Sequence, residues 1–131
     1  MAISTQVILT NSTPGLLVRV GHHVSSGVWH PAPPVLIPPG KVDTWETDAD
    51  GFMTGVKGWV GYVLIIDTTS LGAVYVAWEN PYSGDNSYAD LCPPGYAFTI
   101  VGGGSSNAVV GFTLAIAKGA ETVERYATVA K

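Results

Sequence analysis

Cysteine and charged residues are scarce in this sequence. A single cysteine, Cys92, excludes an intrachain disulfide, so a packed core has to stabilise the fold, and the chain suits a reducing compartment. Only six residues are lysine or arginine, and the formal net charge is −4. So few basic side chains argue against a nucleic-acid partner, and against membrane binding that depends mainly on anionic lipid.

Long apolar segments are also missing. The longest apolar runs reach about half of the roughly 20 residues that a transmembrane helix needs. Residues 1–6 contain neither the basic region nor the apolar region of a cleaved signal peptide. We therefore expect a soluble protein without a classical signal peptide, either cytoplasmic or non-classically secreted. If it meets a target membrane, it does so at the surface.

Glycine and proline, in contrast, are plentiful between short apolar segments. Sixteen glycines and nine prolines among 131 residues suit many short strands joined by tight turns. Residues 120–130 fit either a helix or an edge strand, and no other stretch predicts a useful amphipathic helix. The sequence therefore predicts one all-β domain over residues 1–131, a compact antiparallel β-sandwich with little helix. Its strands are expected at residues 5–11, 16–20, 42–47, 54–66, 73–78, 96–101 and 108–117.

The longest apolar run, residues 54–66, is expected to be the central strand. Its β-branched and aromatic residues favour a pleated surface, and its glycines indicate a bend or a bulge. The next apolar run, residues 73–78, should pair with it as an antiparallel hairpin. Trp59 and Tyr62 are three positions apart, so they should face opposite sides of the sheet.

No pattern in the sequence indicates catalysis. The three histidines, His22, His23 and His30, lie in a turn-rich stretch without a metal-binding or general-base motif. The acidic residues between positions 43 and 50 lack the terminal glutamate of a calcium loop. We therefore expect no enzyme activity, no metal and no cofactor.

The aromatic residues near the end of the predicted hairpin are the strongest functional signal. Trp78, Tyr82, Tyr88 and Tyr96 follow one another around a loop expected at residues 80–88, whose proline and glycine would fix its shape. Rings exposed there would suit a boundary between apolar and polar surroundings and would attract a quaternary ammonium group. The alternative is that the rings cap the core, since aromatic residues fill cores as readily as interfaces.

Three short motifs follow one another between residues 26 and 88. They are Pro38-Pro39-Gly40-Lys41, then Thr54-Gly55 with Gly58 and Tyr62, then Asn80-Pro81-Tyr82 with Asn86-Ser87-Tyr88. In type and order they resemble the Pro-x-Gly-Lys turn, the Thr-Gly-x-x-Gly-x-x-x-Tyr strand and the Pro-Tyr loop with a downstream Asn-x-Tyr of the actinoporin-like superfamily. That group includes sea anemone cytolysins and, more distantly, aegerolysins and fungal fruit-body lectins.

This resemblance implies a β-sandwich that recognises phosphocholine lipid head groups, notably sphingomyelin. The cytolysins begin with an amphipathic helix that forms the pore, whereas the first strand expected here starts almost at Met1. The resemblance therefore implies a lipid-binding relative of the cytolysins that lacks the pore helix and would not lyse membranes by itself. By position in the motifs, the implied head-group site consists of Ser26, Val56, Pro81, Tyr82, Tyr88 and Tyr96.

Two other functions fit the same sequence. A lectin would bind carbohydrate on the same fold, because a fold does not fix its ligand. A self-assembling structural β-protein would use exposed aromatic rings as a subunit interface. The expected partner is a membrane lipid with a choline head group. A pore-forming partner protein, or further copies of the chain, would join it if the protein is one component of a toxin.

Overall fold

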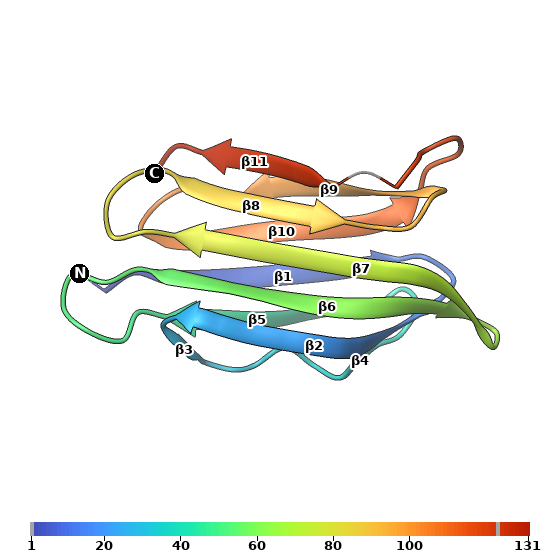
Figure 1. The fold of residues 1–131 in the computed structure, drawn as a ribbon, viewed down its shortest axis with the longest axis horizontal. Coiled ribbons are helices and arrows are strands. Elements are labelled where there is room, and N and C mark those ends of the chain that lie inside the picture. Colours follow the sequence, from blue (N-terminus) through green and yellow to red (C-terminus); the bar gives the residue numbers. More distant parts are fainter. Residues whose placement is uncertain (1, 123) are drawn as a thin grey trace.

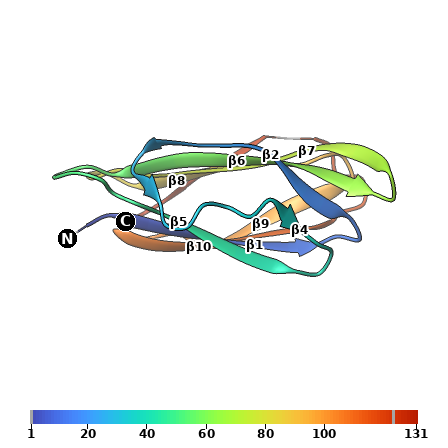
Figure 2. The ribbon, with the colours of Figure 1, turned by 90° about the horizontal axis from the view of Figure 1, so that it is seen from below.

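Two β-sheets packed face to face form the protein in the computed structural model, which describes residues 2–122 and 124–131 (Figures 1 and 2). The described residues contain no helix that could cross a bilayer, and their regular structure consists of strands. The predicted all-β sandwich is confirmed. The five-stranded sheet has the order β3 (Val28–Trp29), β5 (Val42–Asp48), β1 (Ser4–Ser12), β10 (Asn107–Ile116) and β9 (Tyr96–Gly102). The six-stranded sheet has the order β11 (Arg125–Val129), β8 (Asn86–Leu91), β7 (Thr69–Asn80), β6 (Val56–Ile66), β2 (Leu16–Ser26) and β4 (Leu36–Ile37).

The β6–β7 hairpin lies at the centre of the six-stranded sheet, as the sequence predicts. β6 pairs antiparallel with β7 along its whole length and with β2 on its other side. Side chains alternate along β6, so Tyr62 is buried between the sheets while Trp59 lies on the outer face. The expected opposite orientation of these rings is confirmed. The bulge between Leu64 and Ile65 does not fall at a glycine of β6, because the extra residue is Leu71 of β7. The two register shifts between β2 and β6 do lie beside Gly61 and Gly58.

Large aromatic side chains from both sheets fill the core. The ring centroids of Trp78 on β7 and Trp45 on β5 are 6.1 Å apart. Trp78 Nε1 also donates a hydrogen bond to Thr47 Oγ1 at 2.9 Å, which links the two sheets. A buried indole N–H thereby has the partner that burial requires. The largest fully buried side chains are Trp45, Trp78, Tyr62, Tyr88, Phe98 and Phe112.

One pairing departs from the predicted antiparallel arrangement. β1 lies between β5 and β10, and it runs antiparallel to β5 but parallel to β10. β1 and β10 lie near opposite ends of the chain, so no short turn constrains their relative direction. The alternation of buried and exposed residues is the same in either direction, because side chains on a strand repeat every two positions.

β8 was missed in the sequence because its first residues were assigned to a loop. Two of its three inward positions, Asn86 and Asp90, carry polar side chains, which hides the alternation that a half-buried strand normally shows. Asn86 donates hydrogen bonds to the carbonyl oxygens of Gly103 and Ser105, both at 2.9 Å, and Asp90 pairs with Arg125. These contacts make polar side chains acceptable at buried positions of the strand.

Two further segments end differently from the sequence-based expectation. β2 continues past residue 20 to Ser26, because two register shifts let it follow β6 through its glycine and polar residues. The ambiguous tail forms the edge strand β11, paired with β8, rather than a helix. The proline-rich segment contributes only the two-residue edge strand β4, as expected for residues that cannot complete a central ladder.

Val60 and Val63 test which face of β6 stabilises the fold. The sequence predicts that at least one is buried, and the structure buries Val60 completely while leaving Val63 partly exposed on the outer face. We expect Val60→Ala to lower the free energy of unfolding by about 2 kcal/mol, because it leaves a cavity between the sheets. Val63→Ala is the matched control and should cost clearly less. Equal costs in urea unfolding would contradict these faces.

Candidate functional site

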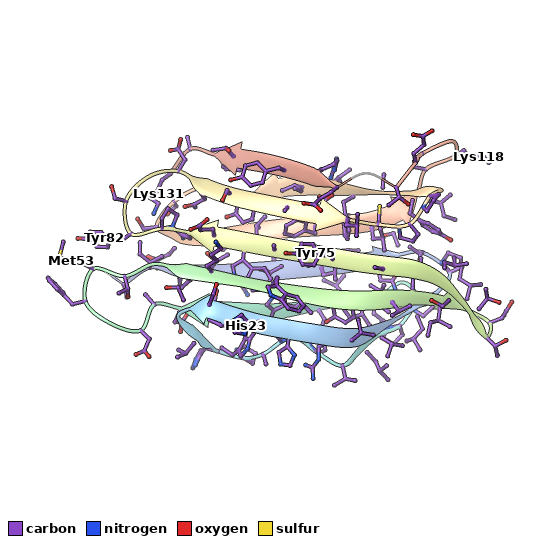
Figure 3. All side chains as sticks on the ribbon, viewed as in Figure 1. His23, Met53, Tyr75, Tyr82, Lys118 and Lys131 are labelled. Atoms are coloured by element: carbon purple, nitrogen blue, oxygen red, sulfur yellow. The ribbon has the colours of Figure 1, made fainter. Side chains whose placement is uncertain are left out.

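Two loops meet at one end of the sandwich, where β6 begins and β7 ends. Residues 49–55 and 81–85 form these loops, and we call this end the tip (left in Figures 1 and 3). Gly55 holds the loops together, because a Cβ at that position would lie 2.7 Å from Pro81 Cα. The Lys131 ammonium donates a hydrogen bond to the Pro81 carbonyl oxygen, which brings the end of the chain to the tip.

Four of the six predicted site residues lie at or beside the tip. Ser26 ends β2, and its Oγ donates a hydrogen bond to the Gly55 carbonyl oxygen at 2.9 Å. Val56 is only 1% exposed, so it supports the tip from within and cannot contact a ligand at the surface. Pro81 and Tyr82 follow β7 directly, and the Tyr82 side chain is 48% exposed.

The most exposed large apolar side chain that the structure describes, Phe52, was not singled out in the sequence. It is 90% exposed, and its neighbour Met53 is 55% exposed. The backbone is left-handed at Gly51 and Met53, with φ of 129° and 57°, so the chain turns sharply beneath both side chains. Met53 and Tyr82 project from the same end of the molecule (Figure 3). The sequence signal that could have identified this loop is a pair of large apolar residues directly after a turn.

Tyr88 does not lie on the surface, and the expectation that its ring is partly exposed is wrong. The residue is 1% exposed, and its ring packs edge-on against Phe112 at a centroid distance of 6.2 Å. Its hydroxyl donates a hydrogen bond to the Gly103 carbonyl oxygen at 2.6 Å, and burial raises the pKa of this hydroxyl to about 12. Trp78 is buried too, so the core alternative holds for these two rings.

Tyr96 lies at the other end of the sandwich. β9 begins at Tyr96, opposite the last residue of β10, and runs from there toward the tip. Its side chain is half-buried and lines a cavity of about 330 Å³ together with Asp90 and Arg125. Arg125 donates two hydrogen bonds to the Asp90 carboxylate, at 3.0 and 2.8 Å. The structure therefore does not bring Tyr96 together with the other predicted site residues.

A second candidate site is a groove on the outer face of the six-stranded sheet, with a volume of about 320 Å³. The rings of Trp59 and Tyr75, whose centroids are 6.0 Å apart, line it together with Tyr126, which is 74% exposed. Figure 3 shows Tyr75 on this face. We call it the sheet-face groove. Its lining is Ser25, Lys57, Gly58, Trp59, Tyr75, Ala77, Trp78, Glu79, Ser87, Tyr88, Ala89 and Tyr126.

The histidines do not form a metal centre. Within residues 2–122 and 124–131, no three histidine, cysteine, aspartate or glutamate side chains come together as a set of metal ligands. His22 instead lies beside Trp29, with ring centroids 5.7 Å apart. Burial and the nearby Arg19 guanidinium lower the pKa of His22.

Comparisons with known proteins identify the fold. No known protein family matches the sequence, so the resemblance to the actinoporin-like superfamily stays a prediction. An uncharacterized protein of Dictyostelium discoideum is 33% identical over 67 residues. The matched part covers 51% of this chain but only 6% of that protein. The crystal structure of the lipid binding protein Nakanori is similar with a TM-score of 0.66 at 12% identity, over 88% of this chain and 72% of Nakanori. The chain is therefore a two-sheet β-sandwich with the fold of Nakanori.

Proposed function

We propose that this protein binds the surface of lipid membranes through the tip, as a binding protein and not as an enzyme. The observation that carries the proposal is the exposure of Phe52, Met53 and Tyr82 in the two tip loops. The fold supports the same kind of partner, because Nakanori is a lipid binding protein.

The tip has the composition of a segment that enters the membrane interface. Full burial of a phenylalanine or methionine side chain is worth about 1.5–3 kcal/mol, and both Phe52 and Met53 leave much of their surface in water here. Tyr82 has an apolar ring and a polar hydroxyl, which suits the level of the lipid head groups. Contact with a bilayer would therefore remove apolar surface from water without any rearrangement of the sandwich.

We further propose a choline head group, as in phosphatidylcholine and sphingomyelin. The exposed ring of Tyr82 can attract a quaternary ammonium group through its face. Asp50 and Asp85 lie in the two tip loops, and their carboxylates disfavour an anionic lipid surface. Pro81 packs closely against Gly55, and Ser26 donates a hydrogen bond to the Gly55 carbonyl oxygen. These two residues would line the head-group site beside Tyr82.

The double variant Phe52→Ser with Met53→Ser tests the proposal. We expect it to weaken binding to vesicles of phosphatidylcholine and sphingomyelin about tenfold, since a loss of roughly 1.4 kcal/mol of apolar burial has that effect. Sedimentation of protein with vesicles over a range of lipid concentrations measures the change. Vesicles with phosphatidylserine should not bind more strongly.

Ile116→Ser is the matched control, because Ile116 is 57% exposed at the other end of the sandwich. It should bind vesicles like the unaltered protein. A double tip variant that also binds normally would refute the proposal. Tyr82→Ala should reduce any preference for choline over ethanolamine head groups.

The proposal extends to a role as one component of a toxin, which would act with a pore-forming partner or with further copies of this chain. Release of dye from the same vesicles measures whether the membrane is permeabilised.

A further inference from the structure

The sheet-face groove is built by strand register. Trp59 pairs with Ala77, Ala77 with Ala89, and Ala89 with Tyr126, so these four residues form one row across four strands. The two alanines form a low floor between Trp59 and Tyr126, and the Trp59 ring leans over Gly61 and Gly21. The ends lie three strand spacings apart, roughly 14 Å. The floor between these two backbone positions is therefore wide enough for a small ring-shaped ligand that rests on the alanines.

The next row supplies polar groups along one side of the same groove. Lys57 pairs with Glu79, and Glu79 pairs with Ser87, so all three side chains point to the outer face. The Lys57 ammonium and the Glu79 carboxylate are 4.0 Å apart and both are partly exposed. Their charges largely cancel, which leaves a hydrogen-bond donor and an acceptor side by side without a net field that would select a charged ligand.

The groove cannot recognise a peptide by strand addition. Its floor lies on β6, β7 and β8, which are paired on both sides, and the edge strand β11 borders it through Tyr126, with its unpaired edge on the side away from the groove. Their backbone groups are therefore engaged, whereas strand addition needs a free edge. A ligand in the groove has to be held by side chains alone, through aromatic faces at the ends and hydrogen bonds along the polar row.

We infer that the sheet-face groove binds a neutral sugar ring, as one or two units of an oligosaccharide or of a glycolipid head group. A sugar ring has an apolar C–H face that packs on an aromatic ring, Tyr126 at one end of the groove or Trp59 at the other, and hydroxyl groups that both donate and accept. Glu79 accepts a hydrogen bond from one hydroxyl and Lys57 donates to another. The volume of about 320 Å³ lies at the lower end of ligand pockets, roughly 300–1,000 Å³, which suits a mono- or disaccharide.

Binding to an array of immobilised glycans tests this inference. The probes are neutral mono- and disaccharides, with sialylated glycans and phosphocholine for comparison, and vesicles that contain a neutral glycolipid form a separate arm. We expect neutral glycans to bind and to change the tryptophan fluorescence, with no fluorescence change in Trp59→Phe. Tyr126→Ala and Glu79→Gln should each weaken binding roughly fivefold to tenfold, because the first removes an aromatic face and the second replaces a charged acceptor by a weaker neutral one.

Tyr82→Ala is the matched aromatic control at the tip and should bind glycans normally, as should the double variant at Phe52 and Met53. Failure of vesicle binding and failure of glycan binding are thereby separate results. If Tyr126→Ala weakens binding to free glycans and to glycolipid vesicles by the same factor, the sugar itself is recognised. The inference is overturned if no neutral glycan binds, if sialylated glycans bind better, or if Tyr126→Ala and Glu79→Gln, both folded by thermal unfolding, bind like the unaltered protein.

Discussion

Replacement of Tyr88 by alanine is expected to lower the free energy of unfolding by about 3–5 kcal/mol, the range for removal of a large buried side chain. Tyr88 is 1% exposed and packs on Phe112 between the two sheets. Its ring also lies against the backbone of Gly103, where a Cβ would stand 2.7 Å from the ring. The variant would leave a large cavity and would remove one of the two side-chain hydrogen bonds that the Gly103 carbonyl oxygen accepts, the other coming from Asn86. Urea unfolding measures the loss.

Tyr82→Ala is the control for this prediction, because Tyr82 follows a neighbouring strand but is 48% exposed. It should unfold at nearly the same urea concentration as the unaltered protein. A Tyr88→Ala variant that is equally stable would show that this ring is not part of the core, and the original expectation of an exposed Tyr88 would then stand.

Tyr88→Phe removes the hydroxyl but keeps the ring, and it should change how stability depends on pH. Burial raises the pKa of the Tyr88 hydroxyl from 10.0 to about 12. Between these values the unfolded chain loses the proton while the folded protein keeps it, so stability falls as the pH rises from 10 to 12. This group contributes roughly 2–3 kcal/mol to that fall. Tyr88→Phe should unfold with a shallower dependence on alkaline pH, and an unchanged slope would contradict the buried hydroxyl.

Replacement of Arg125 by methionine is expected to lower the free energy of unfolding by about 3 kcal/mol, near the lower limit for breaking a buried ion pair. The Asp90 side chain is only 2% exposed, and Arg125 is its bidentate partner. The Arg125 side chain is 47% exposed, so solvent weakens the pair and the lower limit applies. Without Arg125, the Asp90 carboxylate would remain buried and unpaired.

A double-mutant cycle with Asp90→Asn distinguishes the lost pair from lost packing. Asp90→Asn alone should cost less than Arg125→Met, because the guanidinium left behind is half exposed. The double variant should be more stable than Arg125→Met, since it carries no buried charge. If Arg125→Met costs the same with aspartate or asparagine at position 90, the cost comes from packing and the prediction is wrong. Because the pair joins β11 to β8, Arg125→Met should also weaken glycan binding through Tyr126.

The sequence by itself determined the hairpin at the centre of the protein and the exposure of Tyr82. The two-residue period of a strand puts Trp59 and Tyr62 on opposite faces whatever the partner strands are, and the structure shows that Tyr62 is the ring inside. Proline and glycine at positions 81 and 84 produce a turn, and a side chain within a turn tends to remain in water. These features depend on residues within a few positions of each other, so a single segment of sequence specifies them.

Only the tertiary structure decided that Tyr88 is buried, that Tyr96 lies far from the tip and that a groove crosses the outer face. Tyr88 is buried because its strand pairs with β7 and β11 and its ring meets Gly103 of a later loop. The groove exists because four strands bring Trp59 and Tyr126 into one row across two alanines. Each of these features depends on which distant strands pair and in which register, and the local pattern of apolar and polar residues is compatible with several such pairings.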